Sequence, residues 1–124
     1  MPVVSNSALP TYDIPGIEHR TFAGPEHGMK TMEVWGQTIV PGSATPVHRH
    51  RCEEAIVVLE GSGTCIIEGR ETRFGPNSTL IISSDAIHQI VNSGDRNMVI
   101  IAALAMSPVL VRDEKGEELK NPWQ

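Results

Sequence analysis

Short runs in which hydrophobic and polar residues alternate make up most of the chain, and turn-forming residues separate them. In residues 54–60, EAIVVLE, the side chains of Glu54, Ile56 and Val58 occupy alternate positions. Alternate side chains of a strand point to the same face, so this pattern predicts a β-strand with one inward face. The other predicted strands cover residues 31–40, 64–68, 71–74, 79–83, 87–92, 97–105 and 109–112.

The spacing of these strands predicts the fold class. They recur roughly every 8–12 residues with Gly, Pro, Asn and Asp between them, which is typical of an all-β sandwich or barrel. A chain of 124 residues is expected to form one domain, residues 1–124. We expect an extended, proline-spaced N-terminal arm at residues 1–15 and the barrel at residues 31–112. Residues 113–124 are expected to form a polar C-terminal tail with one weak helical turn.

Charge and composition exclude several classes of partner. The net charge of −5 and the lack of a Lys/Arg cluster argue against nucleic acid. No hydrophobic run approaches the length that crosses a membrane, and the N-terminus lacks the pattern of a secretory signal. Two cysteines, Cys52 and Cys65, do not make a disulfide framework, so we expect free thiols and a cytoplasmic location.

Three histidines and one glutamate are the candidate metal ligands. His48 and His50 are two residues apart, so in a strand both imidazoles point the same way. Glu54 follows on the next strand, and a buried carboxylate is costly unless it is paired or binds metal. His88 lies 38 to 40 residues downstream, where a barrel strand can return beside the first pair. This ligand set accepts zinc, manganese, iron, nickel or copper.

Three further residues have side chains of a type that binds metal: Cys52, His19 and His27. A Cys52 thiolate is an alternative ligand, although a small filler or surface thiol is the preferred interpretation. His19 and His27 lie in turn-like surroundings, and we expect both to be exposed to solvent.

The residues around these histidines resemble the two motifs of the cupin superfamily. The spacing Gly42-x5-His48-x-His50-x3-Glu54-x6-Gly61 agrees with the first motif at every position. The second motif agrees at His88 and Asn92, whereas other residue types replace its two glycines and its proline. These replacements are Asn77, Asp85 and Ser83. The resemblance implies a double-stranded β-helix, or jelly-roll barrel, with His48, His50, Glu54 and His88 on the metal.

A narrower resemblance, over roughly residues 16–112, is to the plant auxin-binding protein family. It rests on the runs HGMK, EVW, TPVHRHRCEE, LEGSGT, NST and DAIHQI. It implies a zinc site that coordinates the carboxylate of an indole acid, beside a pocket formed here by Trp35, Gln37, Thr45 and Pro46. The chain departs from the plant proteins by lacking a signal peptide, a Lys-Asp-Glu-Leu tail and the terminal cysteines. We therefore expect a prokaryotic-type relative, in which Trp123 is a candidate for the aromatic pocket residues of the plant C-terminus.

Two functions remain open. The first is a binding protein that holds a small, largely apolar and aromatic carboxylate on a divalent metal, preferably zinc. The second is a metal-dependent dioxygenase, isomerase, decarboxylase or lyase acting on a small carboxylate, with Glu54 as the candidate base. Small cupins resemble one another in forming dimers, and the N-terminal arm and an unpaired edge strand suit a homodimer.

Overall fold

The strands of the chain form two facing antiparallel sheets, shown in the computed structural model, which describes residues 2–124. The described part contains two short 3-10 turns, η1 (Asn6–Ala8) and η2 (Pro25–His27). Its strands are β1 (Tyr12–Ile14), β2 (Ile17–Ala23), β3 (Glu33–Ile39), β4 (Glu54–Glu60), β5 (Gly63–Ile67), β6 (Arg70–Phe74), β7 (Ser78–Ile82), β8 (His88–Val91), β9 (Met98–Leu104), β10 (Val111–Arg112) and β11 (Glu118–Leu119). No helix in residues 2–124 is long and apolar enough to cross a membrane.

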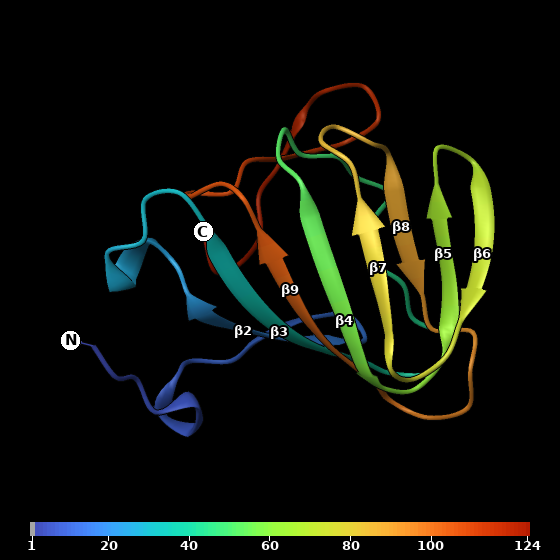
Figure 1. The fold of residues 1–124 in the computed structure, drawn as a ribbon, viewed down its shortest axis with the longest axis horizontal. Helices are drawn as coiled ribbons and strands as arrows, with labels where there is room; N and C mark the ends of the chain where they lie inside the picture. Colours follow the sequence, from blue (N-terminus) through green and yellow to red (C-terminus); the bar gives the residue numbers. More distant parts are fainter. Residues whose placement is uncertain (1) are drawn as a thin grey trace.

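The larger sheet has the strand order β1-β2-β3-β9-β4-β7, and the smaller sheet has the order β6-β5-β8 (Figure 1). β9 lies between β3 and β4, although these two precede it by many residues in the chain. β10 and β11 pair with each other as a small hairpin. The prediction of an all-β, double-sheet barrel is confirmed.

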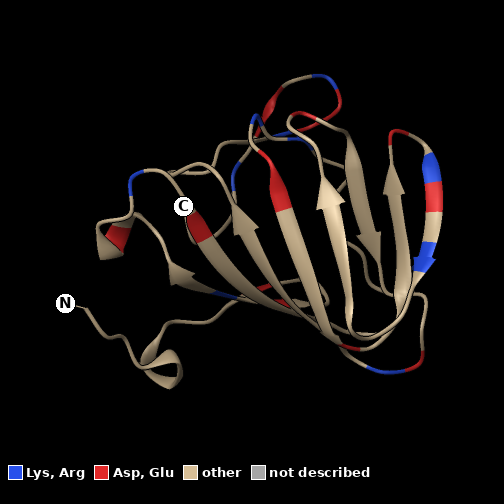
Figure 2. Ribbon diagram, in the orientation of Figure 1, with Lys and Arg blue, Asp and Glu red and all other residues tan. Residues whose placement is uncertain are grey.

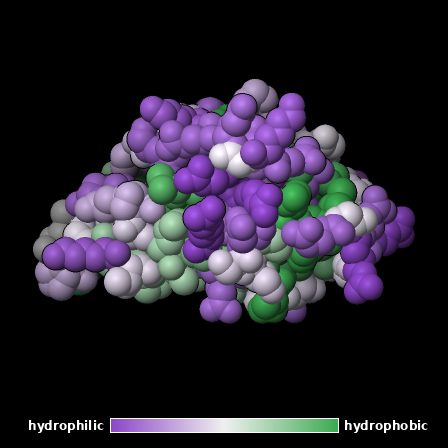
Figure 3. Space-filling model, turned by 90° about the horizontal axis from the view of Figure 1, so that it is seen from above, coloured by the Kyte–Doolittle hydropathy of each residue, from purple (hydrophilic) through white to green (hydrophobic). Residues whose placement is uncertain are grey.

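The core fills the space between the sheets with alternate side chains of the central strands. β9 buries Met98, Ile100, Ala102 and Leu104, while its intervening residues are only partly buried. Removing such side chains from water contributes roughly 25 cal/mol for each Å² of apolar surface. Charged residues lie mainly in the loops, at strand ends and along β6 (Figure 2). Seen from above, the molecule is hydrophilic over its middle and carries hydrophobic patches at the sides (Figure 3).

The turns explain how the altered second motif still folds. Asn77 and Asp85, which replace glycines, have φ angles of 61° and 66°. Asn and Asp tolerate this left-handed conformation better than most residues, because their short polar side chains hydrogen-bond locally. Asp85 N donates to His50 O at 2.8 Å, so this turn also fixes the backbone beside a candidate ligand.

Two segments differ from the predicted elements. The histidine segment is not a regular strand, since His48 and Arg49 form isolated bridges to His88 and Arg112. The C-terminal tail contains the strand β11 instead of a helical turn, because residues 118–119 return to pair with residues 111–112 of β10. In the expected arm, Tyr12–Ile14 pairs with β2 as the edge strand β1.

Candidate metal centre and ligand cavity

The structure brings the three candidate histidine ligands together around one point. His48 and His88 face each other across a bridge whose backbone N···O distances are 3.0 and 2.8 Å. Their ring centroids are 4.2 Å apart, and His50 lies 4.9 Å from His88. One ring nitrogen from each of the three lies within 4.8 Å of the others. We call these three residues the histidine cluster.

Backbone carbonyls hold all three rings by the nitrogen that points away from the cluster. The Nδ1 atoms of His48 and His88 lie 2.6 Å from Pro46 O and 2.8 Å from Ala86 O. His50 Nδ1 lies 3.3 Å from Cys52 O. A carbonyl oxygen only accepts, so each Nδ1 carries a proton and donates it. Each Nε2 is therefore left to face the cluster, as in protein metal sites.

The carboxylate of Glu54 lies against this cluster. Its Oε1 is 3.0 Å from His50 Nε2 and 3.3 Å from His88 Nε2. His88 Nε2 is buried and has no hydrogen-bond partner among residues 2–124. Because the proton of His88 is on Nδ1, a lone pair and a carboxylate oxygen face each other here. A cation between them removes the repulsion, so the residues fit a metal ion.

Burial and the carboxylate move the pKa values in this group apart. Burial lowers the pKa of His48 to about 4. Burial also opposes a charged His50, but hydrogen bonds to Cys52 and Glu54 outweigh it and raise the pKa to about 10. For Glu54, burial favours the neutral acid, yet the hydrogen bond to His50 and the charge of His50 outweigh it and lower the pKa to about 2. A proton on His50 Nε2 thus occupies a position that suits a metal.

The Cys52 thiol lies on the outer side of His50. Its Sγ is 3.4 Å from Nδ1, the nitrogen that is already directed away from the histidine cluster. The residue is buried, with 5% of its surface exposed. Both observations agree with the preferred interpretation of Cys52 as a small filler and not a ligand.

A mostly apolar cavity adjoins the cluster, and all four predicted pocket residues line it: Trp35, Gln37, Thr45 and Pro46. It also contacts His48, Glu54 and His88. Trp123, the candidate for an aromatic pocket residue, also lines it. The remaining lining residues are largely aliphatic and were not predicted: Ile14, Ile17, Ile56, Ile90, Ile100, Ala102, Val111, Leu119 and Asn121. The space is about 50 Å³. Since pockets for drug-sized ligands measure about 300–1,000 Å³, an aromatic acid needs side chains to move.

The polar groups of the cavity wall are few and neutral. Thr45 Oγ1 accepts from Ile90 N at 2.9 Å, so its own proton is available to a ligand. Trp35 Nε1 donates to Glu33 Oε1 at 2.9 Å, which leaves the indole ring as an apolar surface. Gln37 Nε2 lies 3.0 Å from His19 Nδ1. The wall can therefore orient a ligand but offers little for proton transfer.

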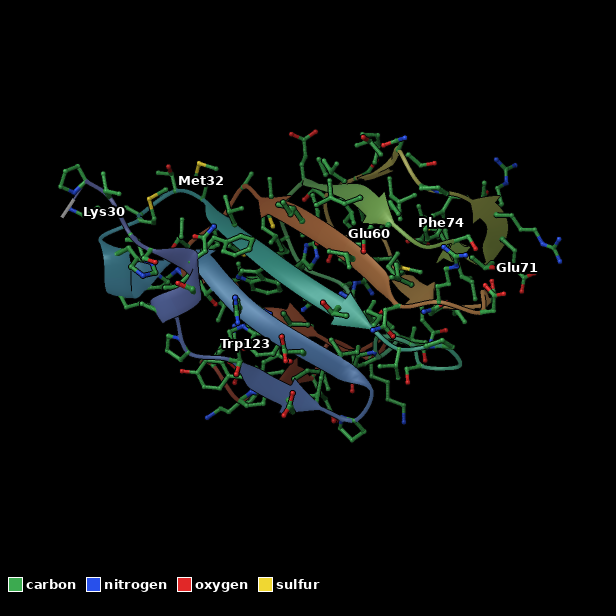
Figure 4. The ribbon with its side chains drawn as sticks, turned by 90° about the horizontal axis from the view of Figure 1, so that it is seen from below. Lys30, Met32, Glu60, Glu71, Phe74 and Trp123 are labelled. Atoms are coloured by element: carbon green, nitrogen blue, oxygen red, sulfur yellow. The ribbon has the colours of Figure 1, made fainter. Side chains whose placement is uncertain are left out.

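Trp123 forms part of this wall and covers His19, so the prediction of an exposed His19 was wrong. His19 is fully buried, because Trp123 stacks on it at 3.4 Å with an interplanar angle of 5°. Trp123 lies beside β2 in Figure 4, and its ring meets Trp35 edge-on at 5.4 Å. The alternation of Ile17, His19 and Thr21 along β2 was the signal that could have placed His19 inside. His27, which was also predicted to be exposed, is half-buried.

Arg49, between two of the histidines, joins the cluster to the C-terminal hairpin. Its backbone exchanges two hydrogen bonds of 2.8 Å with Arg112, next to Val111 of the cavity wall. Its guanidinium binds both carboxylate oxygens of Asp85 at 3.0 and 3.2 Å. The candidate metal ligands and part of the cavity wall are thus parts of one connected unit.

Comparison with solved structures defines the class of protein. The polyketide cyclase RemF from Streptomyces resistomycificus has a TM-score of 0.77 and 22% sequence identity, and the alignment covers 92% of this chain and 85% of RemF. An RmlC-like cupin from Shewanella frigidimarina has a TM-score of 0.75 and 14% identity, with 87% and 93% covered. These likenesses establish that the chain has the cupin fold.

The family follows from the sequence. The sequence model described as "Auxin binding protein" matches residues 1–114, so the chain belongs to the auxin-binding protein family. Auxin-binding protein 1 from Arabidopsis thaliana is 40% identical over 124 residues. That alignment covers 90% of this chain and 63% of the plant protein, so the chain spans just under two-thirds of this relative.

Proposed function

We propose that this protein binds a divalent metal, preferably zinc, through His48, His50, Glu54 and His88. The metal would anchor the carboxylate of a small aromatic acid. The observation that carries the proposal is the unprotonated His88 Nε2, which faces Glu54 Oε1 at 3.3 Å beside an apolar cavity. A metal bound there supplies a Lewis-acidic anchor for an anion. Manganese, iron, nickel and copper accept the same ligands, so the preference for zinc rests on the resemblance to the plant auxin-binding proteins.

The residues of the cavity perform the rest of the recognition. The hydroxyl of Thr45 donates a hydrogen bond to the acid, and the aliphatic side chains exclude water from its ring. Trp35 offers an apolar aromatic surface, and Pro46 closes the wall next to His48. The name of the Arabidopsis relative supports an auxin-like acid, that is, a small aromatic ring carrying a carboxylate.

The test is to measure metal content and acid binding together. Protein purified without chelator is expected to hold about one divalent metal ion per chain, and chelation is expected to lower its melting temperature. Indole-3-acetate or phenylacetate should raise the melting temperature of the metal-loaded protein only. Metal-free protein that responds equally would show that the metal is not the anchor. His27→Gln is the matched histidine control, because His27 lies outside the cluster.

The second candidate is a metal-dependent cupin enzyme acting on a small carboxylate, with Glu54 leaving the metal to act as a base. The structural neighbour RemF is a polyketide cyclase, which favours an enzyme as the alternative. The neutral cavity wall favours binding instead. Product formation and oxygen uptake, followed with iron or manganese loaded, separate the two: turnover that Glu54→Gln abolishes would establish the enzyme.

We further infer a cytoplasmic homodimer. The two buried thiols, Cys52 and Cys65, suit a reducing compartment. Exposed Val57, Leu59 and Ile81 on β4 and β7 offer an apolar surface for a second copy. Light scattering should give twice the chain mass, and Ile81→Lys should shift it to the monomer. A monomeric parent protein would contradict the inference.

A further inference from the structure

An ion pair beside the histidine cluster joins the two segments that supply its histidines, residues 48–50 and 85–88, which we call the ligand segments. Arg49 lies between two of the histidines, and Asp85 lies three residues before the third, His88. Arg49 donates from Nε to Asp85 Oδ1 at 3.0 Å and from Nη2 to Oδ2 at 3.2 Å. Two parallel hydrogen bonds between a guanidinium and a carboxylate fix the orientation of both groups as well as their distance. The pair therefore fixes one ligand segment relative to the other.

Few other contacts hold the ligand segments together. Within residues 2–124, three backbone hydrogen bonds of 2.8 to 3.0 Å join them, in place of a regular strand ladder. In the metal-free protein, the lone pair of His88 Nε2 faces the carboxylate of Glu54 at 3.3 Å. Their repulsion tends to spread the histidine cluster. An additional restraint between the ligand segments opposes this spreading.

Asp85 combines the two properties that its turn and the ion pair require. Its φ of 66° is left-handed, a conformation that Asp and Asn tolerate and for which the second cupin motif has glycine. Glycine has no side chain and asparagine has no charge, so of these three residues only aspartate forms an ion pair with Arg49. The departure from the motif at this position therefore supplies a partner for the arginine between the histidines.

We propose that Arg49 and Asp85 are positioning residues that hold the histidine cluster assembled before the metal arrives. The ion pair restrains both ligand segments, so less conformational freedom is lost when an ion binds, and the affinity for the ion is higher. The inference rests on the metal binding in the proposed function, and it adds a role for two residues outside the ligand set.

Charge alone would have a different effect from positioning. Arg49 brings a positive charge close to a site for a cation, so on charge alone its removal would tighten metal binding. Removal of the Asp85 carboxylate would weaken metal binding by the same argument. A positioning role requires both removals to weaken it. The direction of the change in Arg49→Gln therefore separates the two explanations.

Zinc affinity, measured by competition with a chromogenic chelator, tests the ion pair. The two side chains are 27% and 41% exposed, so solvent screens their attraction. Arg49→Gln and Asp85→Asn should each weaken zinc binding by about fivefold, which is the upper end for a partly exposed pair. The double variant should also lose about fivefold, because both substitutions break the same interaction.

Arg51→Gln is the matched control. Arg51 follows His50 directly, is exposed, and forms no ion pair within residues 2–124. Its substitution removes the same charge from the same part of the chain and should leave the zinc affinity within about twofold of the parent value. A loss as large as that of Arg49→Gln would show that any arginine here has this effect and would overturn the inference.

Three other results would overturn the inference and leave the metal anchor intact. The first is unchanged or tighter zinc binding in Arg49→Gln, and the second is unchanged binding in Asp85→Asn. The third is a loss of about 25-fold in the double variant, which would show that the two residues act independently. If the parent protein binds no zinc, the proposed function falls and the inference falls with it.

A metal-free measurement separates positioning from a general loss of stability. Amide exchange followed by NMR should be about fivefold faster in metal-free Asp85→Asn at His48 and His88, which form the bridge between the ligand segments. The amide of Asn77 donates to Val58 O at 2.9 Å, away from the ligand segments, and its exchange should be unchanged. Equal acceleration at all three amides, or none at the bridge, would overturn the inference.

Discussion

Metal binding should release one proton from His50, and Glu54 should control that release. At pH 8, His50 with a pKa of about 10 is charged, whereas His48 with a pKa of about 4 is already neutral. Glu54, with a pKa of about 2, is ionised and contributes no proton. A metal that takes Nε2 of His50 must displace its proton. The apparent affinity should therefore rise about tenfold per pH unit between roughly pH 7 and 9.

Glu54→Gln is the informative perturbation. Glutamine keeps the shape of the side chain but removes the charge that helps raise the pKa of His50. Burial, which lowers that pKa, then has more influence, so the variant should release less than half a proton at pH 8. Loss of this charged ligand should also weaken metal binding by about 100-fold or more. Substituting a residue that only supports a metal ligand typically weakens binding by about 10- to 100-fold, and a ligand itself should matter at least as much.

The assay is zinc titration calorimetry in buffers with different ionisation enthalpies. The buffer dependence of the heat gives the number of protons released. Zero protons from the parent protein at pH 8, or the same number from Glu54→Gln, would refute the reasoning. Cys52→Ser serves as a control for the thiol beside His50 Nδ1, since it removes Sγ and keeps the carbonyl.

The same pair sets the pH dependence of the metal-free protein. The pKa of Glu54 is lowered from 4.5, so its stabilisation is present above pH 4.5 and is lost as the pH falls towards about 2. The pKa of His50 is raised from 6.5, so its stabilisation is present below pH 6.5 and is lost as the pH rises through about 10. Urea unfolding should therefore give the largest contribution of the pair at about pH 4.5 to 6.5, and a stability difference from Glu54→Gln that stays constant from about pH 2 to 10 would contradict it.

Three further changes test other parts of the structure. His88→Ala should abolish the response of the melting temperature to chelator, because it removes the unpaired Nε2, and elemental analysis should find little metal. Gly63→Ala should destabilise the fold by about 1–3 kcal/mol in urea unfolding, since the added Cβ would lie 2.3 Å from Val91 O. Gly75→Ala has open space and should change stability little. Trp123→Ala should cost about 1–3 kcal/mol and, by enlarging the cavity, shift binding towards bulkier aromatic acids in calorimetry.

Much of the fold could be predicted because local patterns specify it. Alternation predicted the inward face of β4, and turns contain residues suited to them, such as Asn77 and Asp85 with positive φ. The spacing from His48 to His88 also indicated where the ligands would meet, since the bridge between them requires only that two segments run alongside. The strand faces and the turns depend on residues that are near in sequence. The meeting of the candidate ligands depends on the strand arrangement of the barrel.

The wall behind Gln37 could not be predicted in the same way. The burial of His19 depends on Trp123, more than a hundred residues away, stacking on its ring. The polar sequence around Trp123 contains no alternation that indicates a return to the cavity. Its position results from the β10–β11 hairpin, whose two-residue strands are too short to stand out in the sequence.

The hydrogen bonds between Arg49 and Arg112 give the protein an order of assembly. The segment with His48 and His50, two candidate metal ligands, is hydrogen-bonded to the β10–β11 hairpin beside the cavity. Metal binding should therefore stiffen this hairpin before an acid binds. The organic ligand then encounters a cavity whose closing segment has already been ordered. Binding of the two should therefore be sequential, ion first, and the exchange of backbone amides at residues 111–119 should slow at the first step.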